Sequence, residues 1–237
     1  MGYLPLFLEM TGKPCLVLGG GAVAERKVLA LLEAHAAVTV VSPSLTLRLR
    51  ALADGHALRH LARRYERGDL HGHVLVYAAL GDIAAARMAA DEARTLGIPI
   101  NVADVNELCT FITPSVAHRG RLQIAISTGG ASPSLAKLLR EEFEARHGPE
   151  YTVLLEILAA AREYLRNHEP DTGERQRINQ ALAASALADC LKRRDFDAAE
   201  HLLMSAIGAD LAQLGFDRAH LVRGLVEVAA TGEAETR

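Results

Sequence analysis

The sequence predicts an α/β protein in which a parallel sheet occupies the first part of the chain and helices alone occupy the last. Two observations predict this class. Up to about Thr113, short β-branched runs alternate with Ala- and Leu-rich stretches that carry apolar residues at helical spacing. After the stretch HGPE that ends at Glu150, the chain carries helical patterns and no further strand signal.

The elements of the first part follow in order. The expected strands are Cys15–Leu18, Val38–Val41, Ala57–Leu61, Val74–Ala78 and Ile100–Val102. The expected helices between them are Val23–Ala34, Leu45–Asp54 and Ile83–Leu96. Gly97 and Pro99 form a stop signal for the last of these helices. This alternation predicts one half of a doubly wound sheet.

The pattern changes after Thr113. The alternating run RLQIAIS leads through TGGASPS into a helix expected from about Pro133 to Arg146, with Ser132 as its cap and Pro133 in its first position. A break at NHEPDTGE interrupts the later helices, and the terminal GEAETR is expected to fray. We therefore expect three parts: residues 1–113, 114–148 and 149–237.

Composition excludes several classes of protein. A net charge of −3 with interspersed charges disfavours nucleic acid as a partner. Three distant cysteines disfavour a disulfide framework, and the histidines, His118 included, lack metal-site spacing, so we expect no bound metal. The N-terminus lacks the features of a signal peptide, and no apolar run is long enough to span a membrane. We expect a cytoplasmic protein.

A glycine-rich turn carries the first functional signal. Gly19, Gly21 and Ala24 form the pattern G-x-G-x-x-A directly after an apolar strand and at the head of a helix. In a Rossmann-like sheet this turn lets the backbone approach a pyrophosphate at the helix N-terminus. Ser42 stands where an acid often binds the ribose of NAD, and no arginine is adjacent to it. The pattern favours NAD modestly over NADP; an ordinary glycine-rich strand end is the structural alternative.

Asp104 is the second signal. It follows the last expected strand of the sheet, on the side where open α/β folds bind ligands. A solvated turn residue or a helix cap is an equally good account of its position.

Three ordered segments together resemble the siroheme synthase family, whose members include precorrin-2 dehydrogenases that are often also sirohydrochlorin ferrochelatases. These segments are YLPLFLEMTGKPCLVLGGGAVAERKVLALLEAHAAVTVVSP, NVADVNELCTFITPSV and LQIAISTGGASPSLAKLLREEFE. The resemblance runs from about Tyr3 to Glu144. It implies a Rossmann-like parallel sheet, a small dimerisation segment over 114–148 and an all-helical C-terminal domain. Since the chain ends where a methyltransferase domain would begin, that activity is expected to be absent.

The resemblance also implies site residues. The NAD pyrophosphate would lie on the turn of Gly21, Ala22 and Val23, and the adenosine ribose along Pro43 and Ser44. The motif adds Gly19 to the cofactor-binding residues, and the position of Ser42 after its strand adds that hydroxyl. Asp104 would be the acid/base residue, and Ser127, Thr128, Gly129 and Gly130 would lie near the tetrapyrrole in the dimerising region. Leu80 departs from the threonine that is usual in the family.

The implied reaction is the NAD-dependent oxidation of precorrin-2 to sirohydrochlorin by a homodimer. Whether Fe²⁺ is then a substrate of the same pocket stays open. Candidate partners for the substrate carboxylates are Arg119, Arg121, Lys137 and Arg140, although a solvated basic face explains these residues equally well. The alternatives are an NAD-binding redox sensor without catalysis and an unrelated dehydrogenase. The sensor would need neither Asp104 nor the Ser127–Gly130 segment, and the second half shows no acid typical of the dehydrogenase.

Overall fold

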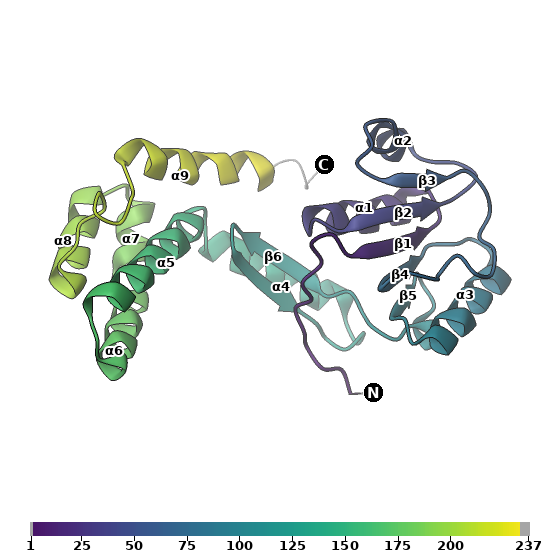
Figure 1. The fold of residues 1–237 in the computed structure, drawn as a ribbon, viewed down its shortest axis with the longest axis horizontal. Helices are drawn as coiled ribbons and strands as arrows, with labels where there is room; N and C mark the ends of the chain where they lie inside the picture. Colours follow the sequence, from purple (N-terminus) through teal and green to yellow (C-terminus); the bar gives the residue numbers. More distant parts are fainter. Residues whose placement is uncertain (1, 233–237) are drawn as a thin grey trace. The chain divides into compact units, whose positions relative to one another are not determined.

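The computed structural model describes residues 2–232, with side chains as far as Val226. The chain forms two compact units, one ending at Thr113 and the other beginning at Pro114 (Figure 1). Residues 233–237, which include most of the terminal stretch expected to fray, lie outside the described part. Among the described helices, none combines the length and apolar character that crossing a membrane requires.

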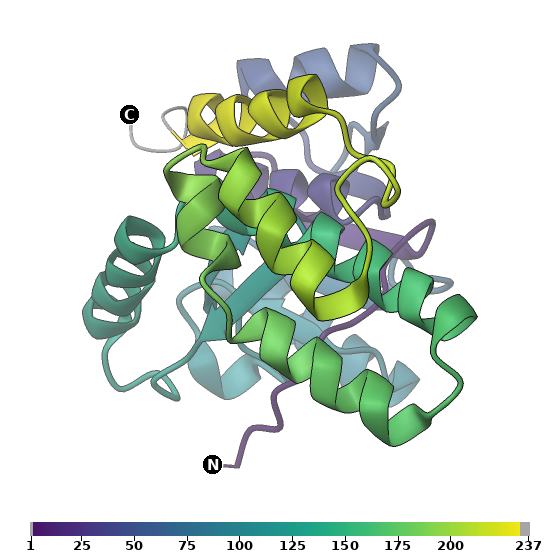
Figure 2. The same cartoon turned by 90° about the vertical axis from the view of Figure 1, so that its left-hand side faces the viewer.

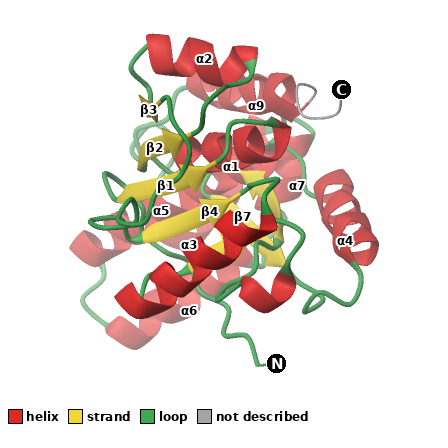
Figure 3. Ribbon diagram, turned by 90° about the vertical axis from the view of Figure 1, so that its right-hand side faces the viewer, coloured by secondary structure: helices red, strands yellow, loops and turns green. Residues whose placement is uncertain are grey.

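The first unit is built on a five-stranded parallel sheet with the order β3-β2-β1-β4-β5. Figure 3 shows β1 and β4 side by side at its centre. The strands are β1 (Pro14–Leu18), β2 (Ala37–Val41), β3 (Arg59–Leu61), β4 (Leu75–Ala78) and β5 (Ile100–Val102). The predicted α/β class and parallel sheet are therefore confirmed. Every expected strand is present, within two residues at each end.

Helices cover both faces of this sheet. They are α1 (Ala22–Glu33), α2 (Leu47–Asp54) and α3 (Ile83–Leu96). Leu16 and Leu18 of β1 pack on α3, whereas Cys15 and Val17 belong to the cluster formed with α1 and α2. Because both faces are buried, β1 is apolar throughout rather than alternating. Burial raises the pKa of the Cys15 thiol to about 11.

Caps define the ends of the helices. Asp82 accepts hydrogen bonds from the first turn of α3, and Gly97 ends that helix in the left-handed conformation. Thr46 accepts a hydrogen bond from the Leu49 amide and so begins α2 two residues later than expected from the sequence. The short 3₁₀ turn η1 (Asn106–Leu108) follows β5.

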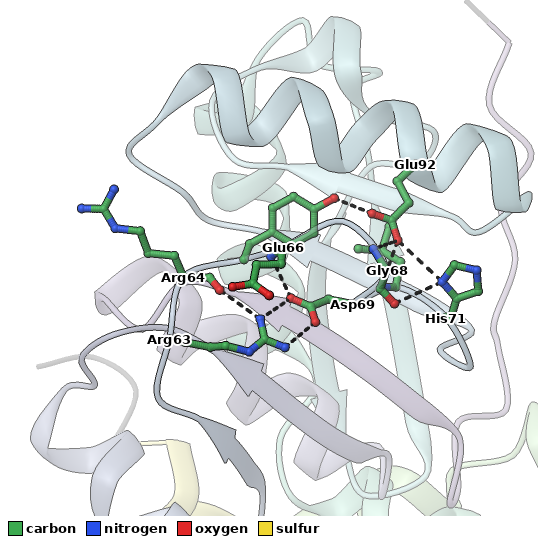
Figure 4. A network of polar contacts seen from close by, with 9 residues as sticks. Arg63, Arg64, Glu66, Gly68, Asp69, His71 and Glu92 are labelled. Atoms are coloured by element: carbon green, nitrogen blue, oxygen red, sulfur yellow. Dashed lines mark hydrogen bonds and ion pairs between the residues drawn. The ribbon is translucent and has the colours of Figure 1, made fainter.

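A polar network fixes the long loop between β3 and β4 (Figure 4). Glu92 of α3 is buried, and it accepts hydrogen bonds from the Tyr65 hydroxyl at 2.5 Å and from the Gly68 amide at 2.9 Å. Burial, and then the bond to Glu92, raise the pKa of Tyr65. The Arg63 guanidinium donates to both oxygens of Asp69 and lowers the pKa of that carboxyl. The loop is therefore held on α3 by paired groups.

The second unit begins with an antiparallel hairpin of β6 (Ser115–Arg119) and β7 (Leu122–Ile126), followed by α4 (Pro133–Arg146). The sequence predicted β7 but not β6, whose apolar alternation is interrupted by Ser115 and His118. Ser132 caps α4 and Pro133 stands in its first turn, as predicted. Arg119 donates to the carbonyls of Glu144 and His147, which ties the hairpin to the end of α4.

The rest of this unit is helical, as predicted (Figure 2). Its helices are α5 (Glu150–His168), α6 (Thr172–Ala183), α7 (Leu187–Lys192), α8 (Phe196–Ile207) and α9 (Arg218–Gly232). The break in NHEPDTGE separates α5 from α6. Leu182, Leu187 and Leu191 are buried in a core with Ile157 and Leu203, which confirms their interpretation as core residues.

Candidate functional site: the carboxyl edge of the sheet

The carboxyl ends of β1 and β4 form the candidate site of the first unit. In the strand order β3-β2-β1-β4-β5, the chain leaves β1 toward β2 on one side, and β4 adds on the other side. This is the point at which the direction of strand addition reverses, and open α/β sheets bind ligands there. The glycine turn after β1 lies at this point.

The glycine turn is packed against two neighbouring loops. Gly19 has a φ of +111°, and its amide donates to the Val41 carbonyl at 2.9 Å. A side chain at Gly19 would collide with the Ala79 carbonyl, and one at Gly20 with the Ser44 carbonyl. Glycine at these two positions therefore lets the turn pack closely against both neighbouring loops. The motif drew attention to Gly19 and Gly21, but did not reveal the tight contact at Gly20.

The N-terminus of α1 is open. Gly21 occupies the cap position and supplies no side chain to the amides of the first turn. Ala22 is exposed and Val23 is half-buried, whereas Ala24 is fully buried against the sheet. Uncapped amides at the positive end of a helix form a site for an anion. Gly21, Ala22 and Val23 are thus placed where a pyrophosphate would fit.

The segment after β2 lies against this turn. The Thr46 amide donates to the Gly20 carbonyl at 3.0 Å. Ser42 is 6% exposed, and its hydroxyl donates to the Ser44 carbonyl at 2.7 Å. The Ser42 hydroxyl therefore shapes the loop, while Pro43 and Ser44 are exposed at its surface. Thr46 also donates to Glu25 of α1, which links the loop to that helix.

A hollow of about 280 Å³ adjoins Pro43 and Ser44. Arg50 and Asp54 of α2 and His60 of β3 line it. The His60 Nε2 atom lies 2.9 Å from the Ser42 carbonyl oxygen. In the sequence no arginine is adjacent to Ser42, but one helical turn of α2 brings Arg50 to the same hollow. Sequence spacing alone did not reveal this basic group.

Asp104 lies at the same edge of the sheet. It follows β5, and the preceding Ala103 amide donates to the Ala78 carbonyl at 2.9 Å, so the turn is fixed to β4. Two strand spacings separate β5 from β1, about 10 Å. Asp104 has a φ of +63°, uncommon for a residue with a side chain. Its side chain is exposed, with no hydrogen bond or ion pair to any described residue. The carboxylate is therefore free to act on a ligand.

Lys27 of α1 is a further polar group on this unit that the sequence did not single out. Its Nζ atom donates to Thr113 Oγ1 at 3.3 Å and lies 5.1 Å from the centre of the Tyr77 ring. Burial lowers the pKa of Lys27, and the neighbouring positive charge of Arg26 adds to this effect. Leu80, where the family resemblance expects threonine, is half-buried against the α3 side of the core.

The segment Ser127–Gly130 belongs to the second unit, between β7 and α4. The Ser127 hydroxyl accepts from the Gly129 amide at 3.1 Å, and the Thr128 hydroxyl accepts from the Ser132 amide at 2.9 Å. These bonds make a compact turn that leads into α4.

Three of the four candidate basic residues already have partners. Arg119 donates all its described hydrogen bonds to carbonyls, and Arg140 is paired with Glu144. Lys137 lies 3.7 Å from Glu141 on the same helix. Arg121 has no ion-pair partner among the described side chains. Within residues 2–226 no group of three or more His, Cys, Asp or Glu is arranged to hold a metal ion.

Two family models match parts of the chain. Residues 6–115 match a family described as putative NAD(P)-binding, and residues 119–146 match one described as sirohaem biosynthesis protein central. The chain is 40% identical to the siroheme synthase of Thioalkalivibrio sulfidiphilus over 89% of its own length and 43% of the relative. It is 44% identical to that of Methylobacillus flagellatus over 75% of its length and 38% of the relative.

A solved structure shares the fold. The chain titled "SirC, precorrin-2 dehydrogenase" matches with a TM-score of 0.70 and 23% identity, over 87% of this chain and 100% of that one. The present chain spans less than half the length of the two siroheme synthases. The family matches and both relatives agree in one respect: over most of its length this chain is similar to siroheme synthases.

Proposed function

We propose that this chain binds NAD at the glycine turn and oxidises precorrin-2 to sirohydrochlorin, with Asp104 as the base. The observation that carries the proposal is the pairing, at one edge of the sheet, of an uncapped α1 N-terminus with a carboxylate that has no partner among the described residues. The similarity to siroheme synthases supports the substrate class.

The residues at this edge divide the work. Gly21, Ala22 and Val23 hold the pyrophosphate through backbone amides, and Pro43 and Ser44 lie along the adenosine ribose, with Ser42 shaping the loop that carries them. NAD, when bound, supplies the hydride acceptor. Asp104 takes the proton that leaves a neighbouring ring atom, so that one hydride and one proton together account for the two hydrogens lost. In the second unit, the proposed contacts to the tetrapyrrole are Ser127, Thr128, Gly129 and Gly130.

The proposal extends to the assembly: the working form is a homodimer. Leu135, Leu138 and Leu139 of α4 are 46%, 50% and 40% exposed and lie three and four residues apart, on one face of the helix. A second copy of the chain would remove this apolar face from water. Insertion of Fe²⁺ into the product is a separate prediction, which the assay below also tests.

The decisive test is an anaerobic assay with precorrin-2 and NAD, in which NADH and sirohydrochlorin are followed by absorbance. Asp104→Asn removes the charge, and asparagine tolerates the left-handed backbone of this position. We expect kcat to fall about 10²- to 10³-fold, as for loss of a general base, with the affinity for NADH unchanged.

Glu107→Gln is the matched control because it removes an exposed carboxylate three residues away in the same turn region. It should leave kcat within twofold. If the wild-type chain binds NADH but forms neither product, the catalytic proposal fails and the sensor alternative takes its place. Adding Fe²⁺ to the completed reaction shows whether the metal enters the product.

A further inference from the structure

The second unit contains a pocket of about 850 Å³ between α5 and α6. Four arginines line it: Arg121 from the turn between β6 and β7, Arg162 and Arg166 from α5, and Arg175 from α6. Its described lining holds no aspartate or glutamate. In a chain with a net charge of −3, such a concentration of one sign marks a local site for an anion.

The positive charges in this pocket are largely uncompensated. Within the described part of the chain, Arg121 and Arg162 have no ion-pair partner. Arg175 donates to the carbonyls of Glu169 and Pro170 and to the Thr172 hydroxyl, all of them neutral groups. Only Arg166 is paired with a carboxylate, that of Glu163. Guanidinium groups in this state favour carboxylate or phosphate ligands.

Helices α5 and α6 and the turn between β6 and β7 hold the arginines of the pocket in place. Arg162 and Arg166 are four residues apart, so they share one face of α5. At Gly120, which has a φ of +56°, a side chain would come within 2.5 Å of Thr152 of α5. The hairpin turn therefore lies directly on α5, and this contact fixes the backbone next to Arg121. Arg175 is held by its three bonds at the start of α6.

The interior of the pocket is apolar. Leu155, Leu158 and Ala159 line it from the same helix face, and Ala183 lines it from α6. Gln176, Asn179 and Gln180 add amide groups. A small inorganic anion would use the guanidinium groups and leave these apolar side chains without a partner. The lining fits a ligand that has a broad apolar body with several acidic groups around it.

We propose that this arginine pocket binds the carboxylate side chains of a tetrapyrrole, with the ring lying over Leu155, Leu158 and Ala159. This inference rests on the proposed function for the identity of the ligand. It assigns carboxylate recognition to Arg121 and Arg162. The sequence had suggested Arg121 for this role but not Arg162. Arg119 and Arg140 are excluded from that role because their guanidinium groups already have partners.

The test uses uroporphyrin, a tetrapyrrole rich in carboxylates, titrated onto the full chain and followed by porphyrin fluorescence. The Arg121→Gln/Arg162→Gln double variant should bind it at least tenfold more weakly. Arg223→Gln is the matched control because Arg223 is exposed on α9, outside the pocket. The affinity of this variant for uroporphyrin should stay within twofold of the wild-type value. Deuteroporphyrin, which has fewer carboxylates, should bind more weakly than uroporphyrin to the wild type and respond less to the double variant.

Two controls keep the result specific. Circular dichroism must show that the double variant is folded, and light scattering must show the same oligomeric state as the wild type. If the double variant is folded but binds uroporphyrin as tightly as the wild type does, the proposal is overturned. It is also overturned if the variant changes only the oligomeric state, or if citrate displaces uroporphyrin at an equal concentration.

The two proposals fail in different ways. If the double variant oxidises precorrin-2 with an unchanged KM and binds uroporphyrin normally, the arginine pocket fails and the proposed function stands. A second outcome is that the wild type oxidises no precorrin-2, while the double variant binds uroporphyrin more weakly than the wild type does. The pocket then stands as a tetrapyrrole site and the catalytic function fails. If both stand, the wild type oxidises precorrin-2, and the double variant loses affinity for uroporphyrin while it keeps its affinity for NADH.

Discussion

Single residues at the sheet edge have separable tasks. The Ser42 hydroxyl is hydrogen-bonded within its own loop. Ser44 and Arg50, in contrast, line the hollow next to that loop. Asp104 has an uncommon backbone conformation, and its carboxylate has no partner among the described residues.

Arg50 is expected to affect the binding of NADPH more than the binding of NADH. If the 2′-phosphate of NADPH reaches the hollow beside Ser44, Arg50 is the guanidinium group placed to meet it. Because Arg50 is exposed, its interaction is worth about 1 kcal/mol. Arg50→Ala should thus weaken NADPH binding about fivefold and leave NADH binding within twofold, as measured by fluorescence titration. Arg48→Ala, on the same helix but outside the hollow, is the control. Equal loss of both cofactors would contradict this role.

At the scale of elements, the loop between β3 and β4 depends on α3. Glu92→Ala would leave the Tyr65 hydroxyl and the amides of Gly68 and Leu70 without their acceptor. We expect a loss of roughly 2–4 kcal/mol in the free energy of unfolding. Tyr65→Phe removes a single bond and should cost about 1 kcal/mol. Urea denaturation measures both changes. Equal costs for the two variants would show that the backbone amides are satisfied in another way.

The exposed apolar face of α4 predicts the oligomeric state of the chain. Leu138→Glu places a charge in the centre of the apolar face, where it would have to be buried in a dimer. Light scattering should show a dimer for the wild type and a shift to monomer for this variant. Leu47→Glu, at a leucine that is 89% exposed on α2, should remain dimeric. A monomeric wild-type chain at micromolar concentration would refute the homodimer.

At the scale of the whole molecule, the two units have separate cores. The first unit has clusters on both faces of its sheet, and the second has a helical core of its own. Each core can support its own unfolding transition. We expect calorimetry of the full chain to show two transitions.

NADH should raise only the transition of the first unit. At a ligand concentration one hundred times Kd the stabilisation is about 2.7 kcal/mol, enough to move a transition of a domain this size by several degrees. Uroporphyrin should in turn raise the transition of the helical unit that holds the arginine pocket. A single transition shifted by either ligand would show that the units unfold together.

The sequence by itself determined the strands, the helices and the glycine turn of the first unit, because these follow from local patterns: apolar runs, helical spacing, caps and glycines. It also placed Asp104 after the last strand of the sheet. Strand β6 was not predicted, because its hydrogen bonds come from pairing with β7 rather than from its own pattern. Gly20 was missed for a related reason, since its contact is with Ser44, far along the chain.

Only the tertiary structure decided which polar groups are committed to the fold and which are free. Arg119 and Arg121 are two residues apart and indistinguishable by sequence pattern. One donates to carbonyls at the end of α4, while the other lines the arginine pocket. Arg162 and Arg175 gave no signal, because they come together only when α5 packs on α6. Local patterns specify the elements, whereas the pairing of side chains depends on contacts between residues distant in sequence.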